Sequence, residues 1–335
     1  MALRLSTAEE VFLFVGTVLI GYVLACVLGL FRRRQTPRSV PYLEPLHLGQ
    51  WAEANEHLLV PPVCNKLVFG EGTWKAMVVG GSNQRADYHI EEGEEFFLQL
   101  RGSMCLKLIE RGAPRDVMIR EGEMFLLPAR IPHSPNRLAD TVGFVMERAR
   151  REGEVDGLRY YTADFGRTLY EEWFHCADLG KDLKPVIDRF NASEAKRSGV
   201  PERDFPLAPV EVDETTAVGA PVPFAEWLDA QRTALGAAKA CTGRPLFERG
   251  AHAEFAVDVY WGACASEACA RGEEAMLFQQ AGVASVRVRP SDGSAEERTL
   301  ALRAGEVMLV PQGHTYALAG EGPDCVGLEF YLQRG

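Results

Sequence analysis

The chain has 335 residues, long enough for two domains, and its 47% hydrophobic content supports ordinary packed cores. Its formal net charge of -11 at pH 7 argues against nucleic acid as a main partner, because no basic excess is present to neutralise phosphates. The eight cysteines are scattered without a CxxC pair, which excludes the disulfide framework of a small secreted protein.

Residues 11–31, VFLFVGTVLIGYVLACVLGLF, form an uncharged apolar stretch. As a helix it would extend about 31 Å at about 1.5 Å per residue, which matches one hydrocarbon core. A buried core helix is the weaker interpretation, because every face of the stretch is apolar. The arginine-rich run RRRQTPR follows it, so the positive-inside rule predicts that the rest of the protein is cytoplasmic. We therefore expect residues 1–40 to be a membrane anchor with a single transmembrane helix.

From Pro41 onward, short apolar runs alternate with glycine and proline, as in KAMVVGG, EFFLQLRG and EMFLLPARIPH. Runs of this length with closely spaced turn residues predict an all-β fold built from antiparallel sandwiches or barrels. Residues 167–190 give the clearest helical pattern. Residues 199–223, rich in proline and acidic side chains, are typical of a linker.

The region after this linker repeats the pattern of the region before it. FLQLRG ending at Gly102 is similar to LFQQAG ending at Gly282, and GEMFLLP is similar to GEVMLVP at almost the same interval. Two matches in the same order indicate a duplicated β-barrel. The alignment places Cys269, Ala275 and Tyr316 opposite His89, Glu95 and His133 of the first copy, so the charged cluster has no counterpart in the second.

The candidate metal ligands lie in the first copy. His89 and Glu95 flank a turn that contains Gly93, so one can end a strand and the other can begin the next while facing the same interior. His133 follows a strand and two prolines, a geometry that can direct an imidazole back into a barrel. Two imidazoles and one carboxylate form the facial triad of non-haem Fe(II) oxygenases, although zinc, manganese or nickel could bind the same set.

Three further carboxylates lie between these ligands, those of Glu91, Glu92 and Glu94. We expect them to form a solvated turn, because like charges this close raise one another's pKa unless water or a cation stabilises them. Glu91 or Glu94 could also accept a hydrogen bond from a ligand imidazole.

The segments HIEEGEEFFLQLRG and GEMFLLPARIPH resemble the cupin signature, in which a first motif supplies His and Glu ahead of a glycine and a second supplies a glycine, a proline and a His. The resemblance implies a two-domain bicupin made of jelly-roll barrels. Glu91 replaces the usual second histidine and Arg130 replaces a usual glycine. The first replacement leaves three ligands in place of four, which favours an open metal that a substrate can chelate.

The segments NQRADYHIEEGEEFFLQLRG, RDVMIREGEMFLLPARIPHSPNR, DGLRYY and EEWFHCADLG resemble the 3-hydroxyanthranilate 3,4-dioxygenase family, densely over residues 74–190 and thinly beyond. The two-barrel layout is similar to the longer animal and fungal type, whose members lack a membrane segment. The resemblance implies an Fe(II)-dependent extradiol-type dioxygenase. Such an enzyme converts 3-hydroxyanthranilate and O2 to 2-amino-3-carboxymuconate semialdehyde, the precursor of quinolinate in NAD biosynthesis through the kynurenine pathway.

Matching residue by residue, the resemblance assigns the Fe(II) ligands to His89, Glu95 and His133. It implies that Arg137 binds the substrate carboxylate and that Glu147 accepts a hydrogen bond from the substrate amino or hydroxyl group. Arg85 would lie near O2, and Glu95 would contact the substrate as well as the metal. A guanidinium fork suits a carboxylate, and a carboxylate inside a barrel needs a donor, so these roles agree with the chemistry of the side chains.

These features predict a catalytic domain over residues 41–198 with a helical extension, a linker over 199–223 and a degenerate metal-free barrel over 224–335. The expected partners are 3-hydroxyanthranilate, O2 and, through residues 1–40, a membrane, and we expect a monomer. Two alternatives stay open. One is a zinc-dependent cupin isomerase acting on a sugar phosphate, and the other is a membrane-tethered cupin scaffold without catalytic turnover.

Overall fold

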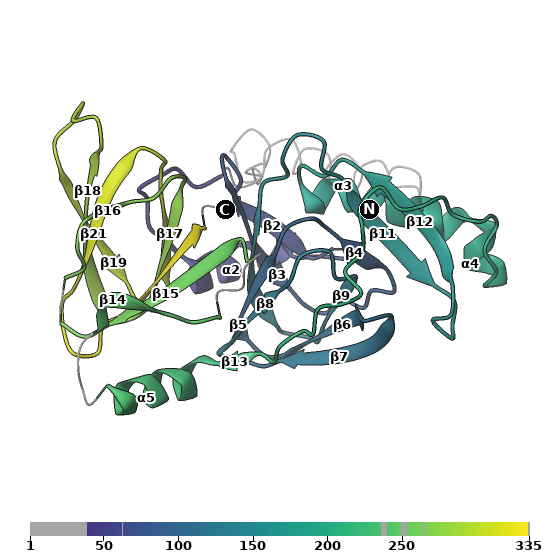
Figure 1. Ribbon diagram of the computed structural model, residues 1–335, viewed down its shortest axis with the longest axis horizontal. Helices are drawn as coiled ribbons and strands as arrows, with labels where there is room; N and C mark the ends of the chain where they lie inside the picture. The colour runs from purple at the N-terminus through teal and green to yellow at the C-terminus, as the bar shows by residue number, and fades with distance from the viewer. Residues whose placement is uncertain (1–38, 62, 236–239, 249–252, 264, 334–335) are drawn as a thin grey trace, which may run out of the picture. The chain divides into compact units, whose positions relative to one another are not determined.

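The computed structural model describes residues 39–61, 63–235, 240–248, 253–263 and 265–333 (Figure 1). Four antiparallel sheets and a few short helices make up this part of the chain. The sheets pair into two barrels, the first blue to teal and the second green to yellow in Figure 1. The prediction of an all-β fold with two cupin-like barrels is therefore confirmed.

The first barrel combines sheets in the orders β13-β8-β5-β10-β3-β2 and β12-β11-β4-β9-β6-β7. Its strands are β2 (Asn65–Phe69), β3 (Trp74–Gly80), β4 (Tyr88–Ile90), β5 (Glu95–Arg101), β6 (Met104–Glu110), β7 (Ala113–Ile119), β8 (Glu123–Leu127), β9 (His133–Arg137), β10 (Val142–Arg148), β11 (Asp156–Tyr161), β12 (Thr168–Phe174) and β13 (Val222–Pro223).

The second barrel combines sheets in the orders β1-β20-β17-β22-β15-β14 and β16-β21-β18-β19. Its strands are β1 (Leu46–His47), β14 (Ala240–Pro245), β15 (Phe255–Trp261), β16 (Cys269–Ala270), β17 (Ala275–Ala281), β18 (Val283–Pro290), β19 (Arg298–Arg303), β20 (Glu306–Val310), β21 (His314–Gly320) and β22 (Val326–Leu332).

The two barrels exchange edge strands. β1 precedes the first barrel in the chain but pairs with β20 of the second, Leu46 opposite Val307. β13 lies just before the second barrel but pairs with β8 of the first, Val222 opposite Met124. Residues 199–221, which join α4 to β13, contain no helix or strand. The backbone amide of Asp213 in this segment donates to the Arg130 carbonyl of the first barrel (3.1 Å). The division of the chain into domains at this segment stays a prediction.

A shared hydrophobic core joins the two barrels. Because side chains alternate along a strand, β5 directs Phe96 and Leu98 into this core while Glu95 and Phe97 face the interior of the first barrel. Phe330 of β22 enters the same shared core, with its ring 4.9 Å from that of Phe96. Burial of one such aromatic side chain stabilises the fold by about 1.5–3 kcal/mol. The alternation therefore directs the carboxylate of Glu95 into the interior of the first barrel.

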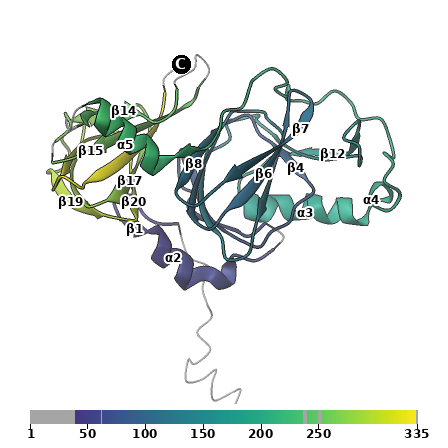
Figure 2. The same cartoon turned by 90° about the horizontal axis from the view of Figure 1, so that it is seen from below.

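The helices are short: α2 (Leu48–Asn55), the 3-10 helix η1 (Glu56–Leu58), α3 (Leu179–Ala192), α4 (Glu194–Ser198) and α5 (Phe224–Ala234). In Figure 2, α3 lies along the first barrel, into whose core it directs Leu183 and Phe190. Asp178 caps the N-terminus of α3 by accepting from the Gly180 amide.

The helical prediction for residues 167–190 is wrong in its first half. Thr168–Phe174 form strand β12, which pairs with β11. Leu169 and Glu171 are buried at alternate positions, and Glu171 accepts from Arg159 of β11 (2.5 Å). Burial with a period of two, fixed by a partner on the neighbouring strand, outweighs the helix propensity of the glutamates.

The prediction of an N-terminal transmembrane helix is corrected, and with it the single-pass localisation and the membrane partner. In the part of the chain that the structure describes, no helix is long and apolar enough to cross a membrane. The longest, α3, has 14 residues, which at about 1.5 Å per residue is about 21 Å and shorter than a hydrocarbon core. The predicted segment, residues 11–31, lies outside the described residues.

Candidate active site

Two facing sheets of the first barrel bring the predicted site residues together. On one sheet, His89 of β4 lies directly opposite His133 of β9, and their ring centroids are 5.1 Å apart. On the other sheet, Glu95 is the first residue of β5 and lies opposite Glu147 of β10. Nε2 of His133 lies 2.9 Å from Oε2 of Glu95. We refer to His89, Glu95 and His133 as the His/Glu/His set.

A cavity of the first barrel contains this set. The residues lining the cavity are Val63, Asn65, Met77, Val79, Arg85, His89, Glu95, His133, Pro135, Arg137, Val145, Leu179 and Leu183. Polar groups occupy one part of the lining, and aliphatic side chains from β3, β10 and α3 occupy the rest. Such a lining suits a small ligand that has an apolar body and charged substituents.

The two histidines have different electrostatic surroundings. Burial lowers the pKa of His89, although its hydrogen bond to Asp156 opposes this effect. Nε2 of His89 donates to Oδ2 of Asp156 (2.7 Å), so Nδ1 carries the lone pair that a metal needs. Burial also acts to lower the pKa of His133, but the carboxylate of Glu95 outweighs it and the pKa is raised.

Burial alone would raise the pKa of Glu95, but the neighbouring His133, His89 and Arg137 outweigh it and the pKa is lowered. The carboxylate is therefore ionised at neutral pH, the state in which it can bind a metal. Nδ1 of His133 donates to the Ile131 carbonyl (3.0 Å), so Nε2 is the nitrogen directed at Glu95. A backbone acceptor on the far nitrogen is the usual arrangement for a metal-binding imidazole.

Three buried side-chain atoms have no hydrogen-bond or ion-pair partner within the described residues, Glu91 Oε1, Arg137 Nε and Glu147 Oε1, and a fourth, Glu95 Oε2, has only its contact with Nε2 of His133. A buried polar atom without a partner costs about 1–3 kcal/mol, so native proteins rarely leave several together without a function. The Glu95 oxygen faces the ring nitrogen of His133, an arrangement that fits a metal cation bound by both, and the unpartnered Arg137 nitrogen fits an anion. Burial lowers the pKa of Arg137 to about 10, which still leaves it cationic at neutral pH.

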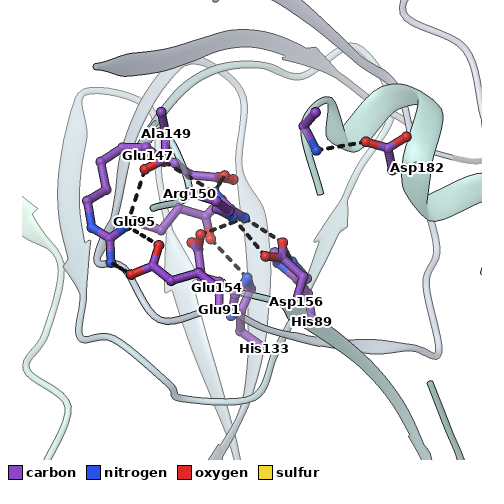
Figure 3. Close-up of polar contacts among 12 residues, drawn as sticks. His89, Glu91, Glu95, His133, Glu147, Ala149, Arg150, Glu154, Asp156 and Asp182 are labelled. Carbon is purple, nitrogen blue, oxygen red and sulfur yellow. Dashed lines mark hydrogen bonds and ion pairs between the residues drawn. The ribbon is translucent and has the colours of Figure 1, made fainter. Parts of the chain in front are cut away.

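Arg150 lies among the remaining carboxylates (Figure 3). It forms ion pairs with Glu91 (2.7 Å), Glu147 and Asp156, and all four side chains are buried. The oxygens of Glu91, Glu95 and Glu147 approach within 4.8 Å of one another, so these three could also be taken for a metal site. The guanidinium of Arg150 already neutralises Glu91 and Glu147, however, and would repel a second cation. The His/Glu/His set is therefore the better fit to a metal.

Arg85 also lines the cavity, but it is paired. Its Nε donates to Oδ2 of Asp87 (3.0 Å), and both side chains are almost completely buried. Burial lowers the pKa of Arg85, but the ion pair with Asp87 outweighs it and the pKa is raised. Arg85 therefore contributes a fixed positive charge to the cavity lining.

No sequence pattern indicates Arg150 or Asp156 as site residues, and the solvated turn predicted for two carboxylates is wrong. Glu91 and Glu94 do not lie in a solvated turn, since their exposed fractions are 2% and 8%. Arg150 stands in the run ERARR, which by composition is typical of a solvated basic surface. Nothing in the local sequence shows that this run enters a barrel beside three carboxylates.

The second barrel repeats the strand register with other side chains. Cys269 lies opposite Tyr316, as His89 lies opposite His133, and Ala275 opens β17 as Glu95 opens β5. These are the positions that the sequence alignment predicted.

Comparison with known proteins agrees with this site. Residues 42–191 match the family model described as 3-hydroxyanthranilic acid dioxygenase. The 3-hydroxyanthranilate 3,4-dioxygenase of Bos taurus is 44% identical over 81% of this chain and 91% of its own length. The proteins of that name from Homo sapiens and Nematostella vectensis are 43% and 41% identical, each over 81% of this chain and over 91% and 93% of their own lengths. The chain belongs to the 3-hydroxyanthranilate 3,4-dioxygenase family. Membership implies a catalytic metal.

Proposed function

We propose that this chain is a ring-cleaving dioxygenase that converts 3-hydroxyanthranilate and O2 to 2-amino-3-carboxymuconate semialdehyde. Family membership supports the reaction and its substrate. One structural observation carries the assignment to this site. Two imidazoles, an ionised carboxylate and a buried guanidinium converge on one cavity, where the carboxylate faces an imidazole nitrogen and the guanidinium has an unpartnered atom.

We assign the metal to the His/Glu/His set and propose that it is Fe(II). Neutral imidazole and carboxylate are suitable donors for ferrous iron, and three protein ligands leave coordination positions for a substrate and O2. When bound, ferrous iron supplies the electron transfer that joins O2 to the aromatic ring.

Arg137 is proposed to bind the carboxylate of the substrate. Its side chain is 2% exposed and its Nε has no hydrogen-bond partner in the described part of the chain. A buried guanidinium forms strong charge-assisted hydrogen bonds with a carboxylate, and its planar fork fixes the orientation of the bound ring.

Glu147 is proposed to accept a hydrogen bond from the amino or hydroxyl group of the substrate through Oε1. Burial raises its pKa to about 7, while Arg150 holds its other oxygen in place. A carboxyl group with this pKa can accept and return a proton near neutral pH. Arg85, fixed by Asp87, is proposed to stabilise negative charge that develops on the dioxygen side of the cavity.

The test is anaerobic loading with Fe(II), followed by addition of 3-hydroxyanthranilate and air. We expect O2 uptake together with the absorbance of the semialdehyde product. Protein loaded with Zn(II) is the matched control, because zinc has no redox chemistry and should give neither signal. An Fe(II)-loaded protein that leaves the aromatic ring intact would contradict the proposal.

The same experiment separates the two alternatives from the dioxygenase. A zinc-dependent isomerase would act on a sugar phosphate without O2 uptake, and a scaffold would show no turnover with either metal. Family membership does not favour either alternative.

A further inference from the structure

The turn that joins β4 to β5 is held by the second barrel. Glu94, its last residue, has an exposed fraction of 8%. Oε2 of Glu94 accepts hydrogen bonds from the backbone amides of Glu254 (2.8 Å) and Phe255 (2.6 Å). Phe255 begins β15, a strand paired with β22 along its length. The residue directly before the metal ligand Glu95 is thus bound to the start of a strand of the second barrel.

A related contact runs in the opposite direction. Glu274 stands directly before Ala275 of β17, as Glu94 stands directly before Glu95 of β5. Oε2 of Glu274 accepts from the backbone amide of Thr73 (2.8 Å), the residue before β3 of the first barrel. The barrels therefore hold each other through a reciprocal pair of carboxylate-to-amide contacts.

The first residues of β3 and β15, Trp74 and Phe255, are aromatic and contact each other. The rings of Trp74 and Phe255 lie 4.9 Å apart at 80°. Trp74 also donates from Nε1 to the Glu274 carbonyl (3.2 Å). The Glu94 and Glu274 contacts are thus parts of one approximately symmetric junction. A variant at one of them can therefore serve as the control for a variant at the other.

Other contacts also hold the turn that joins β4 to β5. Arg148 donates from Nε to Glu254 (2.8 Å) and from Nη1 to Glu154 (2.6 Å), and its side chain is 3% exposed. A Cβ placed on Gly93 would lie 3.4 Å from Arg148, so the turn packs closely against this guanidinium. Glu91, at the start of the turn, is held by Arg150 (2.7 Å). With both ends of the turn fixed, the backbone that carries Glu95 has little freedom to move.

We propose that the second barrel positions the metal ligand Glu95 by holding Glu94 through the amides of Glu254 and Phe255. Glu94 is then a positioning residue for the metal site. Glu274 holds a turn that leads to Ala275, which offers no metal ligand, and its other oxygen accepts from the Tyr42 hydroxyl, so its loss should weaken the contacts around Thr73 and Tyr42 and leave the metal ligands in place. This inference rests on the proposed function, because the metal site belongs to that proposal.

The test compares Glu94→Ala with Glu274→Ala in the full chain. Both variants lose one side of the reciprocal contact, and we expect both to lower the Tm. Fe(II) affinity, measured anaerobically by equilibrium dialysis, should fall about 10- to 100-fold in Glu94→Ala, the range for residues that orient a metal ligand. It should stay at the native value in Glu274→Ala. Native affinity in Glu94→Ala, or an equal loss in both variants, would overturn the inference.

Glu94→Gln is the conservative variant. Its amide oxygen can accept the same two backbone hydrogen bonds, so Fe(II) affinity should stay close to native. A loss as large as that of Glu94→Ala would show that charge, and not the contact, matters, and would overturn the inference. If Glu94→Ala does not fold, Glu94→Asp against Glu274→Asp replaces it, because a side chain one methylene shorter no longer reaches the amides.

The outcomes for the native chain keep this inference distinct from the proposed function. Native protein that binds no Fe(II), or that binds it without opening the ring, contradicts the proposed function. Native protein that binds Fe(II) and turns over, with a Glu94→Ala variant of equal affinity, contradicts only the positioning role.

Discussion

The two barrels share a strand register but differ in what the register places inside them. The first barrel has the His/Glu/His set at three positions where the second has Cys269, Ala275 and Tyr316. The interior of the second barrel instead contains a hydrogen-bond network around Glu329. This carboxylate is buried and accepts from Arg271 (2.7 Å), Tyr260 (2.7 Å) and Tyr316.

The comparison shows how a functional interior differs from a structural one built on the same strands. The buried side-chain atoms without a hydrogen-bond partner in the described residues all belong to the first barrel. In the second barrel, both oxygens of Glu329 are bonded within the protein. One interior requires a ligand to complete its polar contacts, and the other is completed by its own side chains.

The largest effect should come from removing an imidazole of the His/Glu/His set. His133→Ala leaves two ligands in place of three. Substitution of a residue that orients a ligand lowers metal affinity by up to about 100-fold, so we expect the loss of a ligand itself to lower Fe(II) affinity further. Ring cleavage should disappear with the metal. Bound iron per chain, measured after gel filtration, checks this, and a variant that retained one iron would contradict the assigned ligands.

Arg137→Ala should separate substrate binding from metal binding. A hydrogen bond to a charged group contributes about 1.5–3 kcal/mol, so KM for 3-hydroxyanthranilate should rise about 10- to 100-fold while iron content stays native. Arg137→Lys is the matched control. It keeps the charge but loses the planar fork, and its KM should lie between the native and alanine values. Loss of iron in Arg137→Ala would contradict this division of roles.

In the second barrel, Glu329→Gln should affect stability and not chemistry. It removes the charge that Arg271, Tyr260 and Tyr316 surround. Loss of one member of a buried ion pair costs about 3–5 kcal/mol, and the partial exposure of Arg271 places this change at the lower end. Thermal unfolding measures the loss, and kcat per folded chain should be unchanged. An unaltered Tm would mean that the network does not hold the barrel together.

The smallest effect is expected from installing the three ligands in the second barrel. The variant Cys269→His, Ala275→Glu and Tyr316→His restores the ligand types at the equivalent positions. The Glu329–Arg271 ion pair still occupies the interior, so the chain should bind no second equivalent of iron. A second equivalent in equilibrium dialysis would show that ligand identity alone distinguishes the two barrels.

Local sequence predicted much of the candidate site because its ligands lie beside turns. His89 and Glu95 stand on consecutive strands joined by one glycine-containing turn, and although these strands belong to different sheets, the alternation of side chains lets both residues face the same interior. The duplicated glycine positions likewise predicted which residues of the second barrel occupy the equivalent positions. Both inferences depend on short-range geometry, which the sequence specifies directly.

Other features depend on contacts between distant segments and were missed. Glu94 resembles a solvated acid in sequence, yet Glu254 and Phe255, far along the chain, supply the amides that bury it. The exchange of β1 and β13 between barrels gives no local signal for the same reason. The composition of β12 predicts a helix, but the strand paired with it determines its conformation.

Residue types at short, fixed spacings were enough to predict the family, the all-β class and the identity of the residues proposed to bind the metal and the substrate. The packing of the folded chain was needed to show which carboxylates are buried, that Arg150 neutralises them and that the second barrel holds the turn before Glu95. Burial and charge pairing depend on which distant segments pack together, and that information is spread over the whole chain.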